Sequence, residues 1–303
     1  MKMYYYKDPK GNFGDDLNSW LWPMLLPKVF DEDESELFVG IGTLLNDRLP
    51  RRPKKHVFGS GVGYGELPFV DSNFIVHAVR GHETARVLGL DSKLVVTDSA
   101  VLIRAVNITR SEEVPNRIGF MPTGHSIQNN DWEAVCEKLG FHYISSHWSV
   151  EKTLLEMTRC SVLMTEAMHG AIVADALRIP WIPINCYGYV LDFKWKDWLS
   201  SLNMTYQPRL ITPLYGPPPE ADAITDLKHA VKRTLMTCGV WSDRWTPPPH
   251  RESSSAIKET AMNELLSASR SPQFLSQDHL IESLTSRYLD LVQRFNNSHV
   301  TTI

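Results

Sequence analysis

Short apolar segments recur along this chain, and each ends at a glycine or a polar residue before a loop or a helical pattern begins. The segments are apolar on both faces, which is typical of strands in a parallel sheet that helices cover on both sides. The pattern therefore predicts an α/β fold. In the first third of the chain we expect strands at 3–6, 37–41, 56–59, 74–79 and 94–96, with helices at 16–25 and 83–88.

The alternation stops at a polar, charged stretch, residues 107–116, and then restarts. We interpret this stretch as a linker and expect two Rossmann-like domains in a GT-B-like arrangement. Ligands of such sheets bind beyond the carboxyl ends of the strands. The second set of strands is expected at 117–121, 141–144, 161–164 and 181–184, with helices at 131–139, 150–158 and 168–177.

The last part of the chain is expected to be a helical extension. One helix is expected at 222–237, between two proline runs. The final helix has large apolar side chains at three- or four-residue spacing, which predicts packing on the body of the protein. A membrane-surface helix is the alternative, although the opposite face carries mixed charges rather than a basic band. The spaced residues are Ile281, Leu284, Tyr288, Leu291 and Phe295. The expected boundaries are 1–112 for the N-terminal domain, 113–240 for the second domain and 241–303 for the extension.

Charge and cysteine usage exclude several classes of protein. The net charge is −4, which does not suit a nucleic-acid-binding protein. The 4 cysteines show no zinc or redox spacing and suit a reducing compartment. There is neither a signal-peptide pattern nor an apolar run long enough to cross a membrane, so we expect a cytoplasmic protein. Neither the acidic run at 31–33 nor the histidine spacing forms a ligand pattern, so no metal site is expected.

Glycines follow several of the expected strands, among them Gly14, Gly42 and Gly61. They let a ligand approach the backbone closely, and bare amides there can bind phosphate or carboxylate oxygens. Tight turns are the alternative interpretation. A dinucleotide site is not favoured, because the segment at 59–63 does not run directly into a helix with an acidic residue about 20 positions further on.

Two basic residues stand at the ends of expected strands. Arg80 could hold a carboxylate or phosphate with two parallel bonds; the alternative is a structural ion pair, for instance with Asp98. His169 lies between a strand and a helix start, where bound anions are favoured. A histidine there can exchange protons near neutral pH, whereas a core histidine is the alternative. Glu166 could orient His169 or act as a second acid, or could simply be a helix-terminal carboxylate.

Adjacent Asp15 and Asp16 follow the first expected strand. Neighbouring side chains diverge, so the two cannot form an acid–base pair on one face. We expect Asp15 to cap the first helix and the other carboxylate to accept a sugar hydroxyl.

Over about residues 1–205 the sequence resembles the polysaccharide pyruvyl transferase family. Residues 12–17 resemble its N-x-G-D-x-L motif, 38–44 and 58–63 its two glycine-ended strands, 79–84 its R-G-x-x-T motif, and 168–180 its L-H-G…A…P helix. The segment 166–183 resembles most the branch that modifies succinoglycan-type exopolysaccharides. Two departures stand out: residues 97–99 read T-D-S where the family often has G-D-P, and an anion-binding arginine often found before L-H-G is missing.

The resemblance implies a bacterial enzyme that moves a pyruvyl group from phosphoenolpyruvate to a sugar of an exopolysaccharide repeat unit. The product is a cyclic ketal, phosphate is released, and no cofactor is required beyond the donor substrate. The implied partners are a lipid-linked oligosaccharide or polysaccharide acceptor and the inner membrane surface. A nucleotide-sugar glycosyltransferase of the GT-B type and a non-catalytic glycan-binding partner of an export complex are the alternatives.

The candidate site combines these residues. The candidate catalytic residues are His169, Arg80 and Glu166, and the candidate substrate-binding residues are Asn12, Gly14, Asp15, Asp16, Gly42, Gly61, Thr84, His125 and Gly170.

Overall fold

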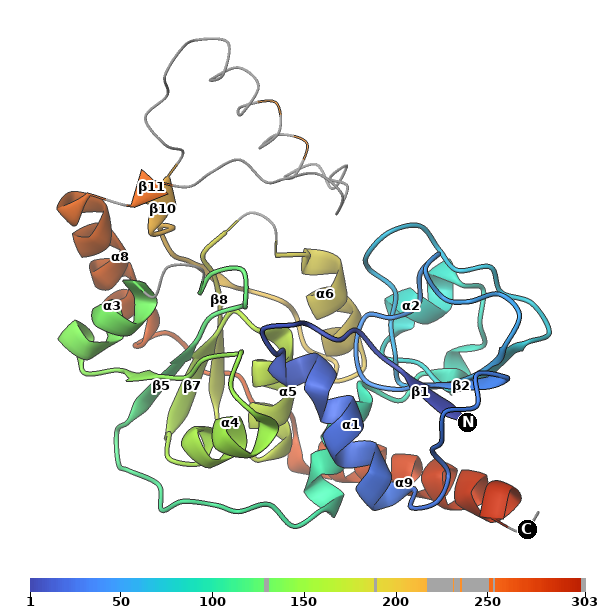
Figure 1. Cartoon of the computed structure of the whole chain (residues 1–303). Coiled ribbons are helices and arrows are strands. Elements are labelled where there is room, and N and C mark those ends of the chain that lie inside the picture. The colour runs from blue at the N-terminus through green and yellow to red at the C-terminus, as the bar shows by residue number, and fades with distance from the viewer. Residues whose placement is uncertain are drawn as a thin grey trace.

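The computed structural model describes residues 1–127, 131–187, 190–216 and 254–300, together with 231, 235, 251 and 252. Within these residues two parallel sheets stand side by side (Figure 1). The first has the order β1-β2-β3-β4, from β1 (Lys2–Tyr4), β2 (Glu36–Val39), β3 (Lys54–Phe58) and β4 (Phe74–Ala78). The second has the order β6-β5-β7-β8-β9, from β5 (Ile118–Met121), β6 (His142–Tyr143), β7 (Val162–Thr165), β8 (Trp181–Asn185) and β9 (Arg209–Leu210). The expected α/β fold with two Rossmann-like units is confirmed.

Helices flank both sheets. In chain order they are α1 (Phe13–Leu25), α2 (His82–Val87), α3 (Asp131–Leu139), α4 (Val150–Met157), α5 (Met168–Ala176), α6 (Asp192–Ser200), α8 (Ser255–Ala268) and α9 (Asp278–Val300), with 3-10 helices η1 (Ser92–Leu94) and η2 (Ser99–Ala105). A short antiparallel pair joins β10 (Tyr215–Gly216) to β11 (Arg251–Glu252). None of the helices in the described ranges is long and apolar enough to span a membrane.

Two sequence expectations differ from the structure or fall outside it. The strand expected at 94–96 is wrong: Val95 makes only an isolated bridge to Val79, because η1 occupies the residues just before it. The helix expected at 222–237 lies outside the described residues, apart from positions 231 and 235. Of the four cysteines, Cys136, Cys160 and Cys186 are buried free thiols, and Cys238 lies outside the described residues. The domain boundaries at 112 and 240 stay a prediction.

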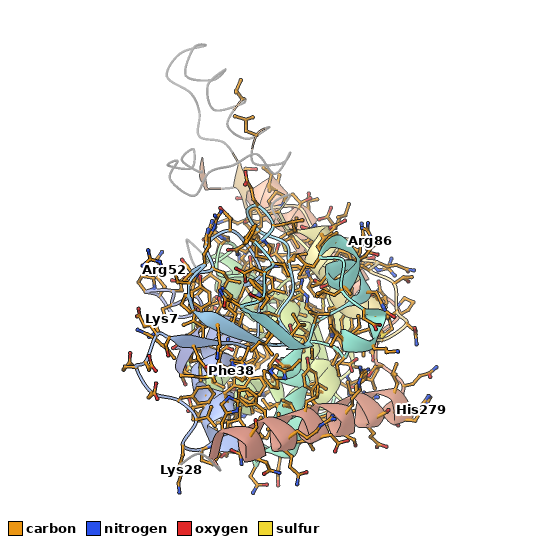
Figure 2. All side chains as sticks on the ribbon, turned by 90° about the vertical axis from the view of Figure 1, so that its right-hand side faces the viewer. Lys7, Lys28, Phe38, Arg52, Arg86 and His279 are labelled. Carbon is orange, nitrogen blue, oxygen red and sulfur yellow. The ribbon has the colours of Figure 1, made fainter. Side chains whose placement is uncertain are left out.

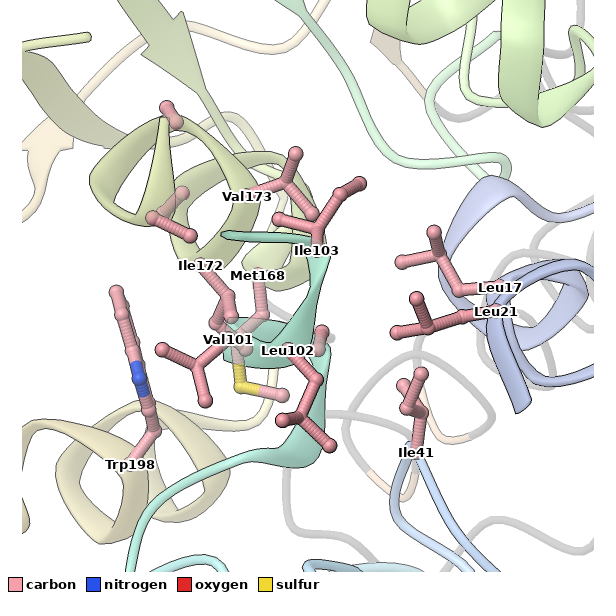
Figure 3. Packing of buried hydrophobic residues seen from close by; sticks show 14 of the residues in the cluster. Leu17, Leu21, Ile41, Val101, Leu102, Ile103, Met168, Ile172, Val173 and Trp198 are labelled. Carbon is pink, nitrogen blue, oxygen red and sulfur yellow. The ribbon is translucent and has the colours of Figure 1, made fainter. Parts of the chain in front are cut away.

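The largest apolar cluster joins the two units. Figure 3 shows Leu102 and Ile103 of η2 between Leu21 of α1 and Ile172 of α5, and all four side chains are buried. The first unit also reaches the second through its N-terminal loop: the Phe13 amide donates to Ser146 O over 2.8 Å. A shared apolar core of this kind holds the two units in one orientation.

The first sheet differs from a regular helix-crossover sheet, because β2, β3 and β4 are joined by segments without a long helix. Instead α9, at the far end of the chain, covers one face of that sheet (Figure 2). The Phe295 ring lies 4.9 Å from the Phe58 ring and 6.0 Å from the Phe38 ring. The expectation that the final helix packs on the body is therefore confirmed. α8 packs separately, in the core of the second sheet, through Ala261 and Leu265.

Candidate functional site

The start of α1 is held by its own polar side chains. Asn12 is the cap: its backbone is extended and its Oδ1 accepts from the Gly14 amide over 3.1 Å. Asp16 Oδ2 accepts in turn from the Asn12 amide over 3.0 Å. The expectation that Asp15 caps this helix is therefore wrong, because Asn12 is the cap and Asp16, not Asp15, accepts from the Asn12 amide. The Asp15 carboxyl group is left for another role.

His169 lies in the first turn of α5, and its ring lies directly on Gly14. A Cβ atom added at Gly14 would be 2.0 Å from His169 Nδ1, so a larger residue at position 14 would displace the ring. The motif glycine of the first unit and the motif histidine of the second are thus in direct contact. This contact joins residues 12–17 and 168–170, which the sequence analysis placed in separate motifs.

Asp98 is the carboxylate next to His169. Asp98 Oδ2 lies 3.5 Å from His169 Nε2, and the Asp98 side chain is 0% exposed. Asp98 Oδ1 accepts from the Ala100 amide over 3.0 Å and caps η2, whereas neither Oδ2 nor His169 Nε2 has a hydrogen-bond partner in the described part of the chain. A buried carboxylate oxygen facing one imidazole nitrogen favours a proton on that nitrogen. The arrangement therefore leaves the lone pair of the imidazole on Nδ1, the nitrogen that faces Gly14.

Asp15 lies next to Gly42 and within electrostatic reach of His169. A Cβ atom at Gly42, where φ is +123°, would be 3.4 Å from Asp15 Oδ1. Burial raises the pKa of Asp15 to about 6, although the nearby His169 and Lys194 side chains act to lower it. A carboxyl group with this pKa can exchange a proton near neutral pH.

Lys194 of α6 supplies a positive charge to this region. Its Nζ donates to Tyr64 Oη over 2.8 Å, and its charge acts on both Asp15 and His125. Neither Lys194 nor Asp98 is among the site residues predicted from the sequence. Asp98 could have been found, because it keeps the aspartate of the G-D-P position even though both neighbours differ. Lys194 carries no such signal, since it is one of two lysines in α6.

Glu166 is fully buried and accepts four hydrogen bonds. Its Oε2 accepts from the Thr123 amide and hydroxyl, both over 3.1 Å, and from the Ser126 hydroxyl, and its Oε1 accepts from the Cys186 amide over 2.9 Å. These bonds join the ends of β5, β7 and β8. The contacts favour a structural anchor over an orienting partner of His169, which lies against Asp98 instead; the role of Glu166 as an acid stays a prediction.

His125 lies on the loop that Glu166 anchors, and its side chain is exposed. Protein atoms around the ring nevertheless displace part of its water and lower the pKa of His125, as does the Lys194 charge, while Asp8 and Glu166 oppose the change. His125 is thus within electrostatic reach of the same lysine as Asp15.

Arg80 belongs to a separate buried cluster between the units. Its Nε donates to Asp197 Oδ2 over 2.9 Å, its Nη1 to the Thr43 hydroxyl over 2.8 Å, and its Nη2 to Val62 O over 2.9 Å. Thr84 donates its amide and its hydroxyl to the same Asp197 carboxylate, each over 2.7 Å. The Arg80 ion-pair partner is therefore Asp197 of α6, not Asp98, because the guanidinium turns toward the second unit. These bonds favour the structural interpretation of Arg80.

Two other predicted glycines pack against side chains. A Cβ atom at Gly61 would be 2.4 Å from Arg80 Cζ, so Gly61 makes room for the guanidinium. A Cβ atom at Gly170 would be 2.6 Å from Thr165 Oγ1, which explains the close approach of α5 to β7. α5 has no side-chain cap at its N-terminus, and such amides attract anions.

Nine of the twelve predicted residues fall into three groups, whereas Asn12 and Asp16 hold the start of α1 and Gly170 packs against Thr165. Gly14, Asp15, Gly42 and His169 come together, with Asp98 and Lys194 added by the structure. Arg80, Gly61 and Thr84 form the buried Asp197 cluster, and Glu166 supports the His125 loop. The first group brings two carboxyl groups, an imidazole and a positive charge into one region. Its role as the site stays a prediction.

Fold and site together define a class: an α/β protein of two parallel sheets with a histidine–aspartate pair at their junction. Over 214 residues the chain is 36% identical to the succinoglycan biosynthesis protein ExoV of Rhizobium meliloti (strain 1021). The match covers 70% of this chain and 68% of that protein. The chain therefore belongs to the family of ExoV. No protein-family model matches the chain, and neither does any solved structure.

Proposed function

We propose that this protein is a bacterial cytoplasmic enzyme that transfers a pyruvyl group from phosphoenolpyruvate to a sugar of an exopolysaccharide repeat unit. The relation to a succinoglycan biosynthesis protein supports a role in exopolysaccharide biosynthesis. The motif resemblance supports pyruvyl transfer as the reaction. The observation that carries the proposal is the His169–Asp98 pair beside Gly14 and Asp15, at 3.5 Å between Nε2 and Oδ2. The acceptor is a lipid-linked oligosaccharide or polysaccharide, which brings the enzyme to the inner membrane surface.

The reaction needs an acid, a base and a cationic surface. The methylene carbon of phosphoenolpyruvate takes up a proton, which makes C2 cationic, and a sugar hydroxyl adds there and gives up its proton. Phosphate leaves with its bonding electrons, and a second hydroxyl adds to C2 and closes the ketal ring. The proton of the second hydroxyl is taken up by the departing phosphate.

The described residues supply these three functions. Asp15, with a pKa of about 6, is protonated often enough near neutral pH to serve as the acid. His169, with Nε2 held toward Asp98, is the base that accepts the hydroxyl proton at Nδ1. Lys194 and the uncapped N-terminus of α5 attract the phosphate and carboxylate of the donor.

The proposal is tested by incubating the protein with phosphoenolpyruvate and lipid-linked glycans and measuring phosphate and pyruvyl ketal. His169→Gln should lower turnover by about 10²–10⁴-fold with Tm nearly unchanged, because glutamine keeps the volume but cannot exchange a proton. His82→Gln, a change at an exposed histidine of α2, is the matched control.

Three outcomes would contradict the proposal. Retained turnover in His169→Gln would remove His169 from the mechanism. Binding of a nucleotide diphosphate without phosphoenolpyruvate would indicate a glycosyltransferase. Glycan binding without phosphate release would indicate a binding partner of an export complex.

A further inference from the structure

A second cluster of ionisable side chains lies at the other edge of the first sheet, where the strands begin. Glu36 is the first residue of β2, and His56 lies on β3 beside it. His299 comes from the last turn of α9. One ligand atom from each of these three residues lies within 4.8 Å of the others. No spacing pattern in the sequence indicates this cluster, because its members come from three separate elements.

His56 is aimed into the cluster. It is 6% exposed, and its Nδ1 lies 3.2 Å from His77 Nε2. Its Nε2 lies 3.5 Å from Glu36 Oε2 and has no hydrogen-bond partner among the described residues. When the bond to His77 uses the Nδ1 proton of His56, the Nε2 lone pair faces the Glu36 carboxylate. Two acceptors then face each other, and a cation between them removes the repulsion.

His299 is oriented in the same way. Its Nδ1 lies 2.9 Å from Phe295 O, a carbonyl that can only accept, so Nδ1 carries the proton and Nε2 keeps its lone pair. A second hydrogen bond that fixes the outer nitrogen of a histidine is the usual support of a metal ligand. Glu36 Oε1 is 3.2 Å from Lys54 Nζ, which leaves Oε2 for the cluster.

We propose that Glu36, His56 and His299 bind a divalent transition-metal ion, for which Zn²⁺ is the best fit. Two imidazole nitrogens with one carboxylate oxygen suit zinc, whereas magnesium and calcium prefer oxygen ligands throughout. Three protein ligands leave the fourth position to water. The ion fastens the last turn of α9 to the first sheet. The site is separate from the His169–Asp98 pair, which lies beyond the opposite ends of these strands.

The test uses the full chain, freed of metal with a chelator and titrated with Zn²⁺ by calorimetry and with Co²⁺ by visible absorption. We expect one ion per chain, a tetrahedral cobalt spectrum, and a Tm roughly 5 °C higher at about 100 times the Kd. His299→Ala should weaken binding by more than about 100-fold, since even outer-shell changes cost about 10- to 100-fold. Glu36→Gln, which keeps the side-chain shape, should weaken it by at least about tenfold.

His279→Ala is the matched control, because it makes the same change on the same helix at the other, exposed end (Figure 2). It should bind zinc like the unaltered chain. Each Tm is measured with and without metal, so that a packing effect of the His299 ring is separated from the metal effect. A zinc-induced rise in Tm that is the same in His299→Ala and His279→Ala would overturn the proposal. So would the absence of stoichiometric binding to the unaltered chain.

Discussion

Asp15→Asn should raise the stability of the protein and lower its turnover at the same time. The pKa of Asp15 rises from 3.8 to about 6 on folding, because burial disfavours the charged form. The folded state therefore holds the proton more tightly, and stability falls as pH rises from about 4 to about 6. At about 1.4 kcal/mol per pKa unit, the upper limit of this loss is about 3 kcal/mol at pH 7. Asp15 is partly exposed, so we expect asparagine to recover about 1–2 kcal/mol.

The assay is urea unfolding of both proteins at pH 4 and pH 7, with turnover measured on the same samples. The increase in the free energy of unfolding should be present at pH 7 and nearly absent at pH 4, where the folded-state carboxyl group is already protonated. Asp16→Asn is the control: Asp16 accepts from the Asn12 amide at the helix start, so its neutralisation should cost about 0.5 kcal/mol. Equal gains for Asp15→Asn at both pH values, or none at pH 7, would refute the reasoning.

Two further substitutions separate structural from chemical roles. Arg80→Lys should lower the free energy of unfolding by about 1–3 kcal/mol, because lysine cannot make the three bonds to Asp197, Thr43 and Val62. The KM for phosphoenolpyruvate should stay unchanged. A raised KM with an unchanged Tm would instead show that Arg80 binds phosphoenolpyruvate. Gly14→Ala should lower turnover by about 10²-fold, because the added methyl group displaces the His169 ring. The Tm should stay within a few degrees of the original, since alanine suits a helix. Normal turnover in this variant would show that the ring can move without loss of activity.

Local patterns predicted the strands and helices that follow a clear periodicity, and they predicted the turn that carries His169. They failed at 94–96. This three-residue apolar run is too short to distinguish a strand from what the structure has there, the end of the 3-10 helix η1 followed by an isolated bridge at Val95. Partners far apart in sequence could not be predicted in this way. Asp98 faces His169, and Asp197 faces Arg80, because of how the two units pack.

The glycines illustrate the same limit. Sequence alone could state that Gly14 and Gly61 permit close approach, but it could not name what approaches. The structure shows an imidazole at Gly14 and a guanidinium at Gly61, both side chains of the protein itself. At these two positions the glycine accommodates a side chain of the protein itself.

The position of α9 determines the order in which the chain can fold during synthesis. Phe38 and Phe58 leave the ribosome long before Phe295, which covers them. Domains usually fold as they emerge, N-terminal first. Here the first sheet keeps an uncovered apolar face until α9 has been synthesised, so the nascent N-terminal half depends on chaperones or on the second unit for protection. A ribosome that stalls before α9 would release an aggregation-prone fragment.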